Sequence, residues 1–251
     1  MGEMNPEQFA FLPPKAVGGF NPEQFEALSP DVFGGFQPGH IKQLPKDFFP
    51  EFDPQAFELL APEAMGGFKP KTFGALPPDL MGGLQPEQLA ELSGNVIKNF
   101  DPEQFDALTP EAFAGFQADQ VKGLPKDLFA DISPEEFSEF SSDALTGLKP
   151  KAAQNLDPSV FEELDADQIG GFKPKTFKKL DGDQIEGIPA KAFGGLTPEQ
   201  AEKMNQVVVS DFDPAQIQKI APECLAALPD PVFKLLEGDL SASQLNGLEA
   251  L

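Results

Sequence analysis

The chain has 251 residues, 40% of them hydrophobic, and it contains no Trp, no Tyr and no Arg, so every basic residue is Lys. Its formal net charge of −23 repels phosphate backbones and anionic lipid, which excludes nucleic acid and negatively charged membrane surfaces as expected partners. No apolar run approaches the roughly 18 residues of a membrane span, and "MGEMNPEQF" lacks a signal-peptide pattern, so we expect neither membrane insertion nor a signal peptide in this chain.

An eight-residue repeat begins at Met4 and continues to Leu236. A first apolar column occupies every eighth position, starting with Met4, Leu12, Phe20 and Leu28. A second apolar column follows five residues after each of these, and it includes Phe9, Val17, Phe25, Phe33, Ile41 and Phe49. Within an octad the second column stands three residues before the next member of the first, so both share one face of a helical turn.

Most octads carry a helix-start signal two residues after the first column. Proline stands there, as at Pro22, Pro54 and Pro102, and it is best tolerated at the first position of a helix. The residue before it is often Asn, Asp, Ser or Thr, which are good N-caps. In "NPEQ" (21–24) and "DPEQ" (101–104) the fourth residue is Gln, which completes a capping box. The sequence therefore predicts that each octad begins a helix.

The same repeat limits how far each helix can run. A proline eight residues later ends the helix, and glycine pairs such as Gly34-Gly35 stand where the turn must end and permit a left-handed C-cap. We therefore predict an all-α repeat solenoid with one to one and a half turns of α- or 3₁₀-helix per octad. A parallel β-solenoid is the rival repeat fold, but strands favour alternating β-branched residues, which this pattern does not provide.

Successive octads differ in one position, the residue just before the second apolar column. It is polar in alternate octads, as in Gln8 and Gln24, and apolar in the octads between them, as in Ala16 and Val32. We call the first kind odd octads (helix starts at residues 6, 22, 38 and so on) and the second kind even octads. The alternation predicts a sixteen-residue coil of two helical turns, with one octad more deeply buried than its partner.

Two places depart from the repeat. The stretch "MNQVVV" (204–209) lacks the proline and has Val207 where an acidic residue is usual, which indicates either local repacking or a contact surface. After Leu236 the register shifts by four residues. We expect a single octapeptide-repeat solenoid over residues 4–236 and a register-shifted C-terminal cap over 237–251, because end repeats must be atypical.

Few residues suggest chemistry beyond folding. His40 occupies an odd-octad position otherwise filled mostly by Gln, which favours a surface or capping role over catalysis. Cys224 occupies the corresponding even-octad position, which favours a small buried hydrophobe over a nucleophile. Lys-Pro-Lys triplets at 69–71, 149–151 and 173–175 indicate solvated corners, or a docking site for an acidic partner.

One metal site is a candidate. The stretches "DADQ" and "DGDQ" place Asp165, Asp167, Asp181 and Asp183 one predicted coil apart, where four carboxylates on adjacent turns would suit calcium. The spacing of an EF-hand is absent from the sequence, and no other cofactor is expected. Calcium is therefore the only ion that the sequence suggests.

The octads "LSPDV" (28–32), "LAPEA" (60–64) and "LTPEQ" (196–200) resemble a known kind of array. They are similar to the octapeptide repeats, of the form Leu-Thr-Pro-Glu-Gln-Ile/Val-x-Ala, in large bacterial secreted and surface proteins of the adhesin and haemolysin-like type. The resemblance covers nearly the whole chain, although this sequence uses more Phe and Gly-Gly. It implies an extracellular or cell-surface location and a structural or adhesive setting, and it transfers no active site.

The sequence as a whole favours a non-enzymatic rod that acts as a rigid spacer or scaffold within a secreted or surface protein. The alternative is a protein-binding module that uses one face of the solenoid and is assisted by calcium. An enzyme would need a polar cluster that interrupts the repeat, and none is visible in the sequence. The expected partners are another protein or, by end-to-end self-association, a second copy.

Overall fold

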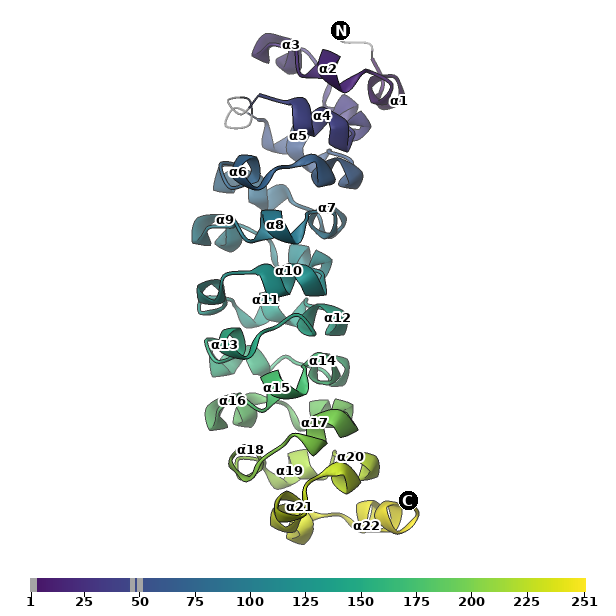
Figure 1. The fold of residues 1–251 in the computed structure, drawn as a ribbon, viewed down its shortest axis with the longest axis vertical. Coiled ribbons are helices and arrows are strands. Elements are labelled where there is room, and N and C mark those ends of the chain that lie inside the picture. The colour runs from purple at the N-terminus through teal and green to yellow at the C-terminus, as the bar shows by residue number, and fades with distance from the viewer. Residues whose placement is uncertain (1–3, 46–47, 49–51) are drawn as a thin grey trace. The chain divides into compact units, whose positions relative to one another are not determined.

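The computed structural model describes residues 4–45, 48 and 52–251. These residues form a series of short α- and 3₁₀-helices without a strand, which confirms the predicted all-α repeat solenoid (Figure 1). Phe49, a predicted member of the second apolar column, lies outside the described residues. The chain divides into two compact units, Met1–Leu124 and Pro125–Leu251, and each is described by itself.

The first unit contains fourteen elements that follow one another at the octad spacing. They are α1 (Pro6–Ala10), α2 (Pro14–Val17), α3 (Pro22–Glu26), η1 (Pro30–Gly35), α4 (Pro38–Gln43), α5 (Pro54–Glu58), η3 (Pro62–Gly67), α6 (Pro70–Phe73), η4 (Pro78–Gly83), α7 (Pro86–Ala90), α8 (Gly94–Ile97), α9 (Pro102–Asp106), η5 (Pro110–Gly115) and α10 (Ala118–Gly123), among the described residues.

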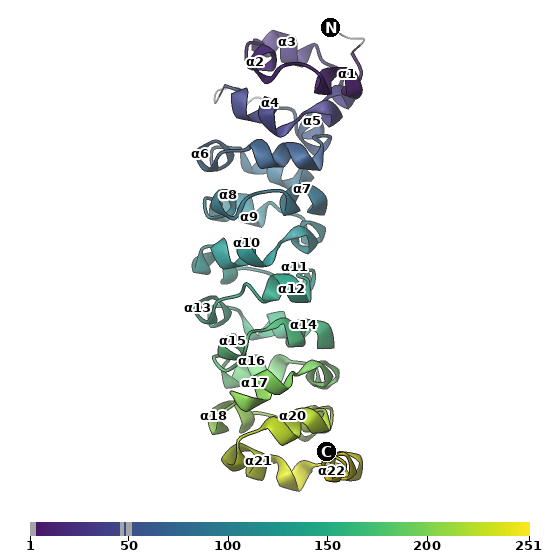
Figure 2. The same ribbon diagram turned by 45° about the vertical axis from the view of Figure 1, so that its right-hand side comes forward.

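The second unit continues the same pattern to its last two elements (Figure 2). Its elements are η6 (Lys126–Phe129), α11 (Pro134–Ser138), α12 (Ser142–Leu145), α13 (Pro150–Ala153), η7 (Pro158–Phe161), α14 (Ala166–Gly171), α15 (Pro174–Phe177), α16 (Gly182–Gly187), η8 (Ala190–Gly195), α17 (Pro198–Glu202), α18 (Gln206–Val209), α19 (Pro214–Ile217), α20 (Pro222–Ala227), α21 (Asp230–Leu236), η9 (Glu237–Asp239) and α22 (Ala242–Glu249).

The helices begin as the sequence predicts. In α3 the proline occupies the first helical position, and the side chain of Asn21 accepts a hydrogen bond from the backbone N–H of Gln24 at 2.9 Å. The Gln24 side chain accepts one in return from the backbone N–H of Asn21, also at 2.9 Å. Two N–H groups that a helix start leaves without an intrahelical partner are thus satisfied reciprocally.

The alternation of the sequence has a structural counterpart in helix type. Every described odd octad forms an α-helix, whereas the 3₁₀-helices η1 and η3 to η8 all lie in even octads. Reciprocal capping boxes that end on a Gln at the third helical position likewise belong to odd octads, apart from the register-shifted α22. Odd and even octads are therefore different local structures built on one apolar pattern.

Stacked helices are further apart in sequence than the predicted coil allows. The helix α14 starts at Ala166 and packs against η8, which starts at Ala190, 24 residues later, and other stacked pairs have the same offset. Side-chain hydrogen bonds between neighbouring coils span 28 and 31 residues. A coil therefore holds between three and four octads. The predicted sixteen-residue coil is wrong, because the sixteen-residue period describes how octads alternate along the chain, not where the coil closes.

The offset of three octads determines which octads touch. Because three is an odd number, a helix of an odd octad packs on helices of even octads, as α14 packs on both α12 and η8. The polar and apolar positions that alternate along the chain thus also alternate from coil to coil up each stack.

Glycine serves close approach between coils instead of left-handed caps. No described glycine has a positive φ, so the predicted left-handed C-caps are wrong. A Cβ atom built on Gly195 would lie only 1.7 Å from the carbonyl oxygen of Ala166, and one on Gly35 only 2.1 Å from that of Pro6. The second glycine of these pairs therefore lets the end of one octad touch the first helical turn of an octad in the preceding coil.

Both apolar columns turn inward and form the core of each unit. Phe9 and Phe36 stack with ring centroids 4.5 Å apart in the first unit, and Phe193 meets Phe212 edge-on at 4.9 Å in the second. Burial of these large side chains from successive coils supplies the main favourable term in folding, since one octad alone has no second layer to cover its apolar face.

The last elements carry the shifted register. The helix α22 is the longest described helix, with eight residues, and it packs on α20. The boundaries of the single solenoid at 4–236 and of the cap at 237–251 stay a prediction. No described helix is both long enough and apolar enough to cross a membrane.

Candidate functional site: a buried amide ladder and two charged faces

The polar residue of the odd octads lies inside the solenoid and connects its coils. In α16 the Oε1 atom of Gln184 accepts a hydrogen bond from the backbone N–H of Asp181 at 3.1 Å. Its Nε2 atom donates to the carbonyl oxygens of Ala153 and Leu156, at 2.9 and 2.7 Å, in the preceding coil. One side chain thus caps its own helix and binds the end of another.

This arrangement recurs through both units, and we call it the amide ladder. Each member is buried, accepts a hydrogen bond within its own octad and donates to two or three backbone carbonyls 24 to 31 residues earlier. The members are Gln88, Gln104 and Gln120 in the first unit, and Gln168, Gln184, Gln200, Gln216 and Gln244 in the second.

The ladder solves a problem that short helices create. The last carbonyls of every helix have no intrahelical donor, and in a solenoid of short helices many such carbonyls are buried. The ladder amides supply donors to them, and no buried side-chain nitrogen or oxygen is unpaired in the part of the chain that the structure describes. The expectation that one kind of octad is less buried is therefore wrong at these positions, because the glutamines are as buried as their apolar counterparts.

His40 takes the place of a ladder glutamine in the first unit. Its Nδ1 atom accepts from the backbone N–H of Gln37 at 3.0 Å, and its Nε2 atom lies 2.9 Å from the carbonyl oxygen of Leu12, 28 residues earlier. A neutral imidazole with its proton on Nε2 satisfies both contacts. The predicted capping role is confirmed, but the side chain is buried rather than on the surface.

Cys224 is buried, as the sequence predicts, and it also makes a bond that the sequence did not indicate. Its Sγ lies 2.9 Å from the carbonyl oxygen of Leu196, again 28 residues earlier. The hydroxyl of Thr176, in the same position of another even octad, donates to the carbonyl oxygen of Leu148 at 2.9 Å. Burial raises the pKa of the Cys224 thiol, and the nearby carboxylates of Glu223 and Glu199 raise it further.

The four predicted calcium ligands cap helices or face solvent. Asp165 and Asp181 are the N-caps of α14 and α16, and each accepts a hydrogen bond from the backbone N–H of the ladder glutamine three residues later. Asp167 and Asp183 are exposed. Sixteen residues do not separate adjacent coils, so the premise that brought the four together is wrong. Over the described residues no three His, Cys, Asp or Glu side chains are grouped to hold a metal, and calcium binding stays a prediction.

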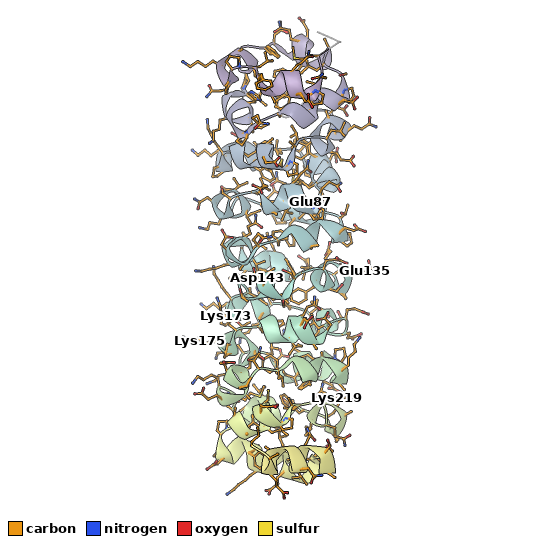
Figure 3. All side chains as sticks on the ribbon, turned by 90° about the vertical axis from the view of Figure 1, so that its right-hand side faces the viewer. Glu87, Glu135, Asp143, Lys173, Lys175 and Lys219 are labelled. Carbon is orange, nitrogen blue, oxygen red and sulfur yellow. The ribbon has the colours of Figure 1, made fainter. Side chains whose placement is uncertain are left out.

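Lysines gather on one side of the second unit. We define the lysine face as the octads 149–156 and 173–180, whose helices α13 and α15 stack on each other. These octads carry six exposed lysines and no acidic residue, and Lys173 and Lys175 project together at one edge of Figure 3. The lysines are Lys149, Lys151, Lys173, Lys175, Lys178 and Lys179.

Carboxylates gather on another stack of the same unit. We define the acidic face as the octads 133–140, 157–164 and 181–188, whose helices α11, η7 and α16 pack in that order and which contain no Lys. Glu135, on the first of these, lies at the edge of Figure 3 opposite to Lys173 and Lys175. The exposed carboxylates of this face that cap no helix are Glu135, Glu139, Glu162, Glu163, Asp183 and Glu186.

The charges of the two faces are not neutralised within the molecule. Among the described residues the ion pairs are Lys126 with Asp127 and Lys203 with Glu202, and neither involves the lysine face or the acidic face. Both faces therefore present charge to solvent.

The irregular stretch at 204–209 keeps the helix and exposes an apolar side chain. Asn205 replaces the usual N-cap and accepts a hydrogen bond from the backbone N–H of Val208 at 3.1 Å. Val207 is 74% exposed. The helix start is therefore preserved without proline, and Val207 leaves an apolar patch on the surface.

Comparison with known proteins adds no relative. No family model matches this chain, and a search of curated proteins finds no match.

Proposed function

We propose that this chain is a non-enzymatic rigid spacer or scaffold that forms part of a larger secreted or surface-attached protein. The amide ladder carries the proposal. It links each coil to an earlier one through buried hydrogen bonds at regular positions, and the repeat continues through both units. The location outside the cell follows from the resemblance to octapeptide arrays of bacterial surface proteins.

Stiffness follows from where the ladder bonds lie. Bending a solenoid opens one side, and here the opening would separate an Nε2 donor from two carbonyls in a water-excluded interior. A buried polar group without its partner costs about 1–3 kcal/mol, so each ladder position resists opening. Glycines such as Gly195 add to this resistance, because they allow direct backbone contact between coils.

The absence of enzymatic activity is part of the proposal. The residues with the most reactive side chains, His40 and Cys224, have their polar atoms engaged with backbone groups in ladder positions. The high pKa of the Cys224 thiol further disfavours the thiolate that nucleophilic catalysis needs.

A distance measurement within the second unit tests the stiffness. Spin labels would be attached at Asp127→Cys and Glu223→Cys in a Cys224→Ala background, since Ala fills the same position in other even octads. The two sites are 96 residues, or between three and four coils, apart, which at about 8–10 Å per coil places them roughly 25–40 Å from each other. We expect one narrow distance distribution by pulsed electron paramagnetic resonance.

A broad or multimodal distribution would contradict the rigid spacer. A labelled pair within one coil, at Asp127→Cys and Ser142→Cys, serves as the control for the spread that the labels themselves introduce. Repeating the measurement with added calcium and with a chelator tests the predicted calcium assistance, which would narrow or shift the distribution if Asp165 to Asp183 bind the ion.

A further inference from the structure

The lysine face and the acidic face belong to the same unit but to different stacks of helices. The lysine face carries a formal charge of +6 over octads 149–156 and 173–180, in a chain whose net charge is −23. Each of the three octads of the acidic face carries three acidic residues and no Lys. Two such faces of opposite sign, left without internal ion pairs, are complementary to each other but not joined within one molecule.

The two faces also match in spacing. The helices α13 and α15 start at Pro150 and Pro174, and the helices η7 and α16 start at Pro158 and Gly182, so both pairs are 24 residues apart and stacked. Successive charged octads on either face are therefore separated by the same step between coils. Two molecules placed side by side can align two lysine-bearing octads with two acidic octads in register.

We propose that the lysine face binds the acidic face of a second copy of this chain, so that the molecules associate side by side through their second units. The inference goes beyond the spacer function and does not depend on it. A second copy is favoured over nucleic acid because the net charge of −23 repels a phosphate polymer at long range, while the matching acidic octads are present in the chain itself.

Salt concentration separates this contact from a nonspecific one. At about 0.01 M ionic strength the Debye length is about 30 Å, so the net charges of two copies repel over their whole surfaces. At about 0.1 M it is about 10 Å, which screens distant charges but leaves close pairs, and at about 1 M it is about 3 Å, which screens the close pairs as well. Association should therefore be greatest near 0.1 M and weaker on either side.

The first experiment is sedimentation equilibrium of the full chain over a range of protein and NaCl concentrations. We expect an apparent mass that rises with protein concentration above 27.0 kDa and is largest near 0.1 M NaCl. A monomer at all concentrations and salts, or association that strengthens steadily up to 1 M NaCl, would overturn the proposal.

Charge reversal on the lysine face gives the specific test, and the chain contains a matched control. The pentapeptide "KPKTF" occurs at 173–177 on the lysine face and again at 69–73 in the first unit. We expect Lys173→Glu with Lys175→Glu to lower the association constant at least tenfold, and Lys69→Glu with Lys71→Glu, which makes the same change in net charge, to lower it less than threefold. Equal effects would show that net charge alone matters and would overturn the proposal.

Complementation identifies the partner face. The variant Glu162→Lys with Glu163→Lys should also fail to self-associate, and an equimolar mixture with Lys173→Glu, Lys175→Glu should restore association, because each variant now meets its opposite charge. No restoration in the mixture would overturn the pairing of these two faces. If wild type stays monomeric yet binds poly-glutamate, the lysine face serves a foreign acidic polypeptide and the second-copy proposal is wrong.

All charge variants change exposed side chains away from the amide ladder, so their folds can be checked directly. Each variant should keep the wild-type circular dichroism spectrum. A variant that does not is replaced by the corresponding Lys→Gln or Glu→Gln pair, for which the expected loss of association has the same sign.

Discussion

A glutamine side chain carries one acceptor and two donor hydrogens, and the ladder position uses both kinds of atom. In Gln184 the acceptor serves the N–H of Asp181 and the donors serve Ala153 and Leu156. Glutamate has the acceptor but no donor, and methionine has the shape but neither strong group. Residue identity at this position therefore decides whether two coils are joined or only stacked.

We predict that Gln184→Met lowers the free energy of unfolding by about 2–4 kcal/mol, because it leaves buried backbone groups of two coils without partners. Urea denaturation followed by circular dichroism measures the change. Gln218→Met is the control, since Gln218 is exposed at the end of α19, and its cost should stay within about 0.5 kcal/mol. Equal costs for the two variants would remove the ladder from the stability argument.

Cys224 gives a prediction on pH. Burial holds the folded-state pKa of its thiol above the ordinary value of 9.0. The stabilisation that comes from burying the neutral thiol is therefore present below pH 9.0 and is lost as the pH rises above it toward the folded-state value. We expect the stability difference between wild type and Cys224→Ala to shrink from pH 8 to pH 10.5, as measured by urea titration at each pH. A constant difference would contradict the buried thiol.

At the scale of the element, the glycine pairs separate helix ending from coil contact. Gly194 and Gly195 lie side by side in η8, but a Cβ on Gly194 would meet its nearest neighbour, the carbonyl oxygen of Lys219, at an ordinary 3.7 Å. A Cβ on Gly195 would overlap the carbonyl of Ala166. The pair therefore provides two positions with the same sequence context and different surroundings.

We predict that Gly195→Ala destabilises the chain by about 3 kcal/mol or more, since backbone of two coils must separate. Gly194→Ala should be neutral or stabilising by up to about 1 kcal/mol, because alanine loses less conformational entropy than glycine. Thermal unfolding of the two variants side by side checks the difference. Similar melting temperatures would mean that the close approach at Gly195 is relieved at little cost.

The helix starts could be predicted from sequence because they depend on local chemistry. Proline at the first position and a cap such as Asn21 before it act within four residues, so a single octad contains the whole signal. The coil length could not be predicted this way, since it depends on the angle between successive helices. That angle is set by contacts such as Gly195 with Ala166, which join residues 29 positions apart.

The ladder itself was partly visible in the sequence. The alternation of Gln with apolar residues showed that odd octads differ from even ones, and the capping box explained the acceptor atom of the glutamine. The donor atoms had no partner in the same octad, and a buried amide without local partners indicates bonds to another coil. His40 and Cys224 carry no such signal by type, because their ladder roles depend on position alone.

At the scale of the whole molecule, charge opposes folding. A net charge of −23 on 251 residues repels itself in the compact state, and salt screens this repulsion. We predict that raising NaCl from 0.01 to 0.15 M increases the melting temperature by several degrees, as followed by circular dichroism. Lys173→Glu with Lys175→Glu, which adds negative charge, should show a larger increase, and a smaller one would contradict this explanation.

The odd number of octads between stacked helices also sets the step by which such a chain can change length. Removing one octad brings two octads of the same kind together in the coil around the deletion, whereas removing two leaves every odd octad on an even one. Deleting residues 157–172 should therefore destabilise the chain less than deleting 165–172 alone. The sequence itself repeats "FNPEQFEAL" (20–28) as "FDPEQFDAL" (100–108), 80 residues or five octad pairs later. Insertions and duplications that survive in this repeat are thus expected to come in multiples of sixteen, a rule of inheritance written by the stacking of its helices.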